Sequence, residues 1–114
     1  MPYKQITDEK IPLHVKREVI ALCADYHRRE VEIERGARRR EVIEKYKDIN
    51  QRIKEGIDEA CPWDSDEIKR ELLRSLGEIR GYNWSPLCTV MSAAAFYRRK
   101  ALALYAIARR LEMI

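Results

Sequence analysis

Residues 43–60 read IEKYKDINQRIKEGIDEA, and apolar side chains recur in them at steps of three and four positions. This spacing is that of one face of an α-helix, and the charged residues between them suit the solvent-exposed face. The sequence therefore predicts an amphipathic helix here, and it must bury its apolar face against a partner helix. The apolar positions are Ile43, Tyr46, Ile49, Ile53, Ile57 and Ala60.

A second apolar stripe precedes the first and ends near Gly36. Pro12 suits the first turn of its helix, where the missing N–H is not needed. Gly36 is either a break between two helices or a residue inside one helix of some fifty residues, because a lone glycine costs only about 1 kcal/mol there. A single long helix and a helical hairpin both stay open at this point. The stripe consists of Val15, Val19, Leu22, Tyr26 and Ile33.

Length and composition favour one helical domain. The chain has 114 residues, 37% of them charged, with 4 Gly and 4 Pro, and few breakers with many charges suit long amphipathic helices. We expect an all-α fold in which residues 1–61 form the long helix or hairpin. Residues 62–114 are expected to form a compact helix-turn-helix-like unit packed against it. No apolar run approaches the roughly 20 residues of a membrane span.

The cysteines and the start of the chain bear on the compartment. Cys23, Cys61 and Cys88 are an odd number at wide spacings, and residues 1–5 lack the pattern of a signal peptide. We therefore expect reduced thiols and a cytoplasmic protein.

The second half contains several helix start and stop signals. Cys61-Pro62-Trp63 ends the preceding helix, because the residue before a proline avoids the α region. Asp64 and Glu67 predict a capping box for the next helix, and Gly81 is placed as the left-handed residue that ends it. The predicted apolar face of this helix consists of Ile68, Leu72, Leu76 and Ile79.

The last helix is expected to start after Ser92. Ser85-Pro86 opens a short helical piece that runs to Val90, and Ser92 then caps a longer helix, with Met91 and Phe96 spaced as a hydrophobic staple. The alternative is one unbroken helix from Ser85 to Leu111. In either case the inward face is expected to consist of Phe96, Leu104, Ile107 and Leu111.

Positive charge is concentrated near the C-terminus. The net charge is only +4, but residues 79–111 contain six basic side chains and neither Asp nor Glu. A medium helix, a short one, a tight turn and a longer basic helix are the order of a helix-turn-helix, whose last helix enters the major groove of DNA. The free N–H groups at its start attract phosphate, and small side chains allow a close approach. The basic residues are Arg80, Arg98, Arg99, Lys100, Arg109 and Arg110.

The segment MSAAAFYRRK at residues 91–100, with the upstream GYNW at 81–84, resembles phage late-gene transcriptional activators of the RinA/ArpU type. Their C-terminal region is similar to a shortened sigma-factor region 4. The resemblance is clearest over residues 62–114, and it implies a non-enzymatic, DNA-binding regulator of phage or prophage type. It also implies that Ser92 caps the recognition helix, while Ala93, Ala94, Tyr97 and Arg98 face the groove.

The first functional hypothesis is therefore a transcriptional regulator that binds duplex DNA. Arg80, Arg98, Arg99 and Lys100 would supply its phosphate contacts, and residues 12–60 would hold a homodimer through their long apolar stripe. The alternative is a helical structural or adaptor protein with a degenerate helix-turn-helix. The run Ala93-Ala94-Ala95 favours this alternative, because alanine offers no hydrogen bond to a base.

Other residue patterns give weaker candidates. Cys23 and His27 share a helical face, but a structural zinc site needs four ligands, so no metal or other cofactor is expected. We expect no enzymatic activity and no small-molecule substrate, because no nucleophile–base, paired-carboxylate or phosphate-loop pattern is present. Residues 38–40 are three consecutive arginines. We expect them to form a solvated surface, and the alternative is a second phosphate contact. Four aromatic residues of the second half are expected to pack in the interior rather than to stack on the bases of single-stranded nucleic acid. They are Trp63, Tyr82, Trp84 and Phe96.

Overall fold

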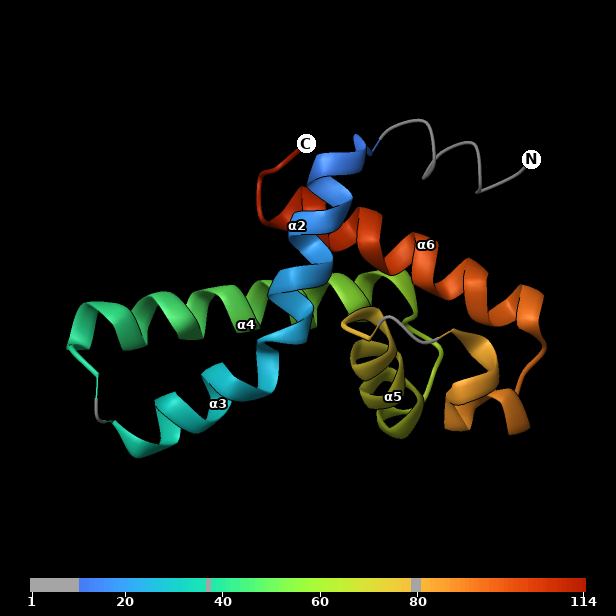
Figure 1. Cartoon of the computed structure of the whole chain (residues 1–114), viewed down its shortest axis with the longest axis horizontal. Helices are drawn as coiled ribbons and strands as arrows, with labels where there is room; N and C mark the ends of the chain where they lie inside the picture. The colour runs from blue at the N-terminus through green and yellow to red at the C-terminus, as the bar shows by residue number, and fades with distance from the viewer. Residues whose placement is uncertain (1–10, 37, 79–80) are drawn as a thin grey trace.

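The structure is a computed structural model that describes residues 11–36, 38–78 and 81–114. All regular elements in these residues are helical, which confirms the predicted all-α fold (Figure 1). The α-helices are α2 (Leu13–Ala24), α3 (Tyr26–Arg35), α4 (Arg40–Ala60), α5 (Asp66–Leu76) and α6 (Ala93–Arg110), and the short 3₁₀ helices are η1 (Tyr82–Trp84) and η2 (Pro86–Thr89). None of the described helices is long and apolar enough to cross a membrane.

Gly36 ends α3 and separates it from α4. Its φ of 61° lies in the left-handed region, and its N–H donates to the carbonyl of Glu32. Glycine adopts this conformation without the steric cost that a Cβ imposes, so it terminates a helix readily. Of the two alternatives, the helical hairpin is therefore correct, and α3 packs alongside α4.

A second break, at Asp25, was not predicted. It separates α2 from α3 and lies outside the spacing of the apolar stripe. Two buried side chains hydrogen-bond to backbone carbonyls on either side of the break. Arg29 donates from Nη2 to the carbonyl of Leu22, and Asn50 of α4 donates to the carbonyl of Tyr26 over 3.2 Å.

The start and end of α5 both differ from the prediction. Ser65, not Asp64, caps the helix: its Oγ accepts from the N–H of Ile68 over 3.3 Å. The helix ends at Leu76, and Gly81 has a φ of −93°, so the prediction of a left-handed terminator there is wrong. Asp64 is free of a capping role because its carboxylate pairs with Arg99, a partner 35 positions away that no local pattern indicates. Ile79 lies outside the described residues.

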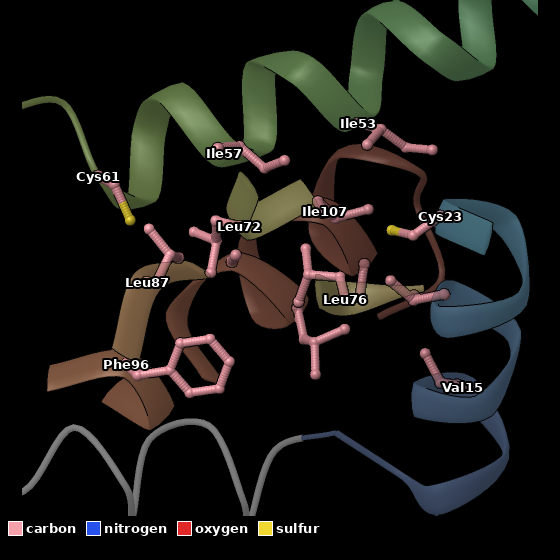
Figure 2. Packing of buried hydrophobic residues seen from close by; sticks show 14 residues of the cluster. Val15, Cys23, Ile53, Ile57, Cys61, Leu72, Leu76, Leu87, Phe96 and Ile107 are labelled. Carbon is pink, nitrogen blue, oxygen red and sulfur yellow. The ribbon is translucent and has the colours of Figure 1, made fainter. Parts of the chain in front are cut away.

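The hydrophobic core lies where α2, α4, α5 and α6 meet (Figure 2). α4 and α6 cross closely at Gly56, where a Cβ would lie 2.7 Å from the side chain of Ile107 and 2.9 Å from its backbone. α2 and α5 approach each other in the same way at Gly77, beside Ala24. The predicted inward faces are confirmed for the described core positions of these helices: Val15, Val19, Ile53, Ile57, Leu72, Leu76, Phe96, Leu104 and Ile107 are buried.

The two sequence segments are packed together, and this bears on the predicted homodimer. α6 packs against α4 and α2, so it covers most of the apolar stripe of residues 12–60. Ile43 and Tyr46 are half-buried in the hairpin. An uncovered stripe was the reason to expect a homodimer, and the fold removes that reason. The homodimer itself stays a prediction.

Candidate nucleic-acid interface

The chain breaks before α6 as the capping pattern predicts. Ser92 has extended backbone angles, and its Oγ accepts from the N–H of Ala95 over 3.2 Å. The cap satisfies one of the amide groups that a helix start leaves without a partner. The break between Val90 and Ala93 is therefore confirmed, and the alternative of one helix from Ser85 to Leu111 is wrong.

The first two turns of α6 have one exposed face, whereas Phe96 in the same turns is buried in the core. Ala93, Ala94, Tyr97 and Arg98 are exposed, and their spacing places them on one face of the helix. We call this face, together with Ser92, the α6 start. Its neighbours toward the C-terminus are anchored, because Ala103, Leu104, Ala106, Ile107 and Ala108 are buried.

Arg99 was predicted to contact phosphate, but its side chain forms an ion pair within the protein. Its Nε and Nη2 donate to the two carboxylate oxygens of Asp64 over 2.7 and 3.1 Å. Asp64 has a side chain only 6% exposed, and hydrogen bonding to it raises the pKa of Arg99. A bidentate pair of this kind is among the stronger charged contacts in proteins. Arg99 therefore joins α6 to the corner between α4 and α5. Because its guanidinium is paired with Asp64, Arg99 is not among the candidate phosphate contacts.

Lys100 and Tyr97 lie at the edge of the α6 start. The Lys100 ammonium lies 5.4 Å from the centre of the Phe96 ring and 5.9 Å from that of Tyr97. Burial lowers the pKa of Lys100, with a smaller lowering by Lys16. The hydroxyl of Tyr97 accepts from the N–H of Tyr82 over 3.2 Å, so this oxygen already has one partner.

The complete helix-turn-helix arrangement is not confirmed. The piece expected as the first helix of the motif is η2, a 3₁₀ helix of four residues capped by Ser85, whose Oγ accepts from the N–H of Leu87. An α-helix there would give a longer platform across the DNA backbone. Of the predicted site residues, the structure brings Ser92, Ala93, Ala94, Tyr97, Arg98 and Lys100 together, while Arg80 lies outside the described residues.

The interior role predicted for the tryptophans is wrong for both. Trp63 is 72% exposed and Trp84 is 70% exposed, whereas Phe96 is fully buried and Tyr82 is half-buried, as predicted. Val90 is also exposed, in the turn before α6. Trp63 directly precedes Asp64, the partner of Arg99, so it lies near α6. Trp63 follows Pro62 in a corner between two helices, and this position was the feature of the sequence from which its exposure could have been predicted.

Cys23 and His27 differ in exposure. Cys23 is buried, which raises its pKa to about 12, whereas His27 is exposed and lies beside Glu30. Within the part of the chain that the structure describes, no group of three or more metal-ligating side chains occurs.

Comparison with known proteins gave no match. No protein-family model, no curated protein and no solved structure matches this chain. The resemblance to phage late-gene activators therefore stays a prediction.

Proposed function

We propose that the protein binds duplex DNA through the α6 start and acts as a transcriptional regulator of phage or prophage type. The observation that carries this proposal is the capped break at Ser92 together with the exposed face of the first two turns of α6, formed by Ala93, Ala94, Tyr97 and Arg98. This exposed end carries a cation and small side chains, and residues 79–111 contain neither Asp nor Glu. The proposal includes a cytoplasmic location, in line with the free thiols of the three cysteines.

Phosphate is the group that this surface suits best. Amide groups and the dipole at a helix start attract anions, and Ala93 and Ala94 allow the backbone to come close to them. Arg98 lies one turn further along and can reach a neighbouring phosphate. Because alanine can contact only a thymine methyl, we expect weak discrimination between sequences. Arg98, Lys100 and Arg80 are the proposed phosphate contacts, and Arg99 has a structural role.

The salt dependence of binding tests this proposal. Each neutralised phosphate contributes a slope of about −0.9 to a plot of log affinity against log salt, so three contacts give about −2.7 per protomer. We expect Arg98→Ala to flatten this slope by about 0.9. Fluorescence anisotropy on a mixed-sequence duplex between about 50 and 200 mM salt would measure it.

The matched control is Arg70→Ala, which removes one exposed positive charge from α5 and should leave the slope unchanged. Equal effects of both variants would show that only net charge matters and would contradict the α6 start as the site. Absence of binding at about 50 mM salt and about 10 μM protein would reject DNA binding altogether.

A structural or adaptor role is the second candidate, and the exposed tryptophans favour it. Trp63, Trp84 and Val90 present apolar surface in the segments beside α6, and exposed aromatic side chains are common at protein interfaces. The two candidates differ in their response to salt. An apolar protein interface would be insensitive to salt and would weaken with Trp63→Ala, whereas phosphate binding would respond to Arg98→Ala.

A further inference from the structure

The α3–α4 hairpin extends beyond the core, and we call residues 26–36 and 38–49 the arm. Tyr26 of α3 and Ile49 of α4 are half-buried and pack against the hydrophobic core at the base of the arm. Between these two positions, none of the described residues belongs to the hydrophobic core or packs against it. Figure 1 shows the arm at one end of the molecule and the beginning of α6 at the other, along the 45 Å axis.

The base of the arm is held by a buried polar network. Arg29 is 2% exposed, and its Nε donates to Oδ1 of Asn50 over 2.6 Å, while Nη2 donates to the carbonyl of Leu22. Asn50 in turn donates to the carbonyl of Tyr26. These contacts connect α2, α3 and α4, so they set the direction in which the arm points.

The tip of the arm is rich in arginine. Arg35, Arg38, Arg39 and Arg40 are all exposed, and no acidic residue lies between positions 35 and 40. Arg38 pairs with Glu32 over 3.0 Å and Arg40 with Glu44 over 3.1 Å, both along the sides of the arm. In the described ranges, no carboxylate pairs with Arg35 or Arg39.

Helix stability does not explain this cluster. Arg39 occupies the N-cap of α4 and makes no side-chain cap, where Ser, Thr, Asp or Asn would stabilise the helix by about 1 kcal/mol. Positive charges at a helix start are also repelled by the helix dipole. Only Arg35, at the end of α3, is placed favourably in this respect. The arginines therefore suit an external anion better than they suit the arm itself.

We propose that the arm tip is a second contact for the phosphate backbone of duplex DNA, at the opposite end of the molecule from the α6 start. This inference rests on the proposed function. Arg35 and Arg39 are the principal contacts, because Arg38 and Arg40 are already paired. The 45 Å length of the molecule exceeds one turn of B-DNA, about 34 Å, so both ends can reach one duplex only when it is long enough.

Duplex length provides the sharpest test. A duplex of 24 base pairs is about 80 Å long and one of 8 base pairs about 27 Å, so only the longer can reach both ends of the protein. We expect the salt slope of the unaltered protein to be steeper on the longer duplex by about 1.8, which corresponds to two phosphates. The double variant Arg35→Gln/Arg39→Gln should remove this difference.

The matched control is Lys54→Gln/Arg70→Gln, which removes two exposed charges from the body of the molecule and should keep the difference. Both variants change exposed side chains, and thermal unfolding followed by circular dichroism should show that they are folded. An arm-tip variant that behaves like the control on the long duplex would overturn the inference. Binding to phosphatidylserine vesicles that needs Arg35 and Arg39, without such an effect on DNA, would overturn it too.

The two proposals fail in distinguishable ways. Weakening by Arg98→Ala alone would retain the α6 start and reject the arm tip. Weakening by the arm-tip variant alone would retain the tip as a DNA contact and reject the α6 start. If the protein binds neither duplex, both proposals are rejected.

Discussion

Asp64 has more influence on the fold than its place in a short corner suggests. Its carboxylate accepts both hydrogen bonds from Arg99 and lies beside the buried thiol of Cys61. One side chain thus connects the end of α4, the start of α5 and the second turn of α6. The pair also holds the α6 start in position, because Arg99 is only two residues from Tyr97.

Asp64→Asn should therefore destabilise the protein markedly. The amide keeps the size of the side chain but leaves the half-buried Arg99 without its counter-charge, a change that costs about 3 kcal/mol in buried pairs. Asp66→Asn is the control, since Asp66 is exposed at the first position of α5 and should cost only about 0.5 kcal/mol through the helix dipole. Urea unfolding of both variants would measure the difference. Equal costs would show that the pair contributes little.

Cys61 should make the protein less stable at alkaline pH. The pKa of its thiol is raised from 9.0 to about 11, mainly by burial and to a smaller extent by Asp64, while Arg99 opposes the rise. The unfolded chain therefore loses the thiol proton first, and the free energy of unfolding falls by about 1.4 kcal/mol per pH unit between pH 9 and 11. Cys61→Ala lacks this contribution.

The measurement compares urea unfolding of the unaltered protein and Cys61→Ala under reducing conditions across that range. As the pH rises, the free energy of unfolding of the unaltered protein should fall relative to that of Cys61→Ala. Lysine and tyrosine titrations affect both proteins equally, so they cancel in the difference. A constant difference would contradict the raised pKa.

Among the helices, the crossing of α4 and α6 depends most on a single position. Gly56→Ala would improve the helix propensity of α4 by about 1 kcal/mol if space allowed. The added methyl group would instead lie within 2.9 Å of both the side chain and the backbone of Ile107. We expect a net loss of about 1 to 3 kcal/mol, as in other overpacked cores.

A smaller side chain at Ile107 provides the control for Gly56→Ala. Gly56→Ala/Ile107→Val should not recover stability, because the Cα and N of Ile107 contribute to the clash. Thermal unfolding of the single and double variants would decide. A stabilised Gly56→Ala protein would show that the two helices are further apart than described.

The helices differ in how far local sequence determines them. The buried faces of α4 and α6 follow from apolar spacing, and Ser92 follows from its capping pattern, because these signals lie within a few residues. The break at Asp25 has no Gly or Pro and depends on Arg29 and Asn50, which meet only in the folded chain. The same reason explains why the pairing of Arg99 was not predicted: its partner is 35 positions away, and a positive charge on a helix looks identical in sequence whether it is paired or exposed.

For the whole molecule, the covered stripe changes the expectation about assembly. With α6 packed on α4 and α2, the described residues of 12–60 leave no long apolar seam that requires a second copy. Sedimentation at high protein concentration tests the homodimer that stays predicted. The proposed DNA contacts do not depend on it, because the α6 start and the arm tip both belong to one chain.

The late position of α6 also affects how the protein is made. α2, α4 and α5 leave the ribosome with their apolar faces uncovered, because α6, the helix that packs against all three, follows them in the chain. At about 5 to 20 residues per second, the unfinished chain persists for several seconds without its core. The core therefore cannot be completed until α6 has been synthesised, and a message that stops before residue 107 would yield a product that chaperones and proteases recognise.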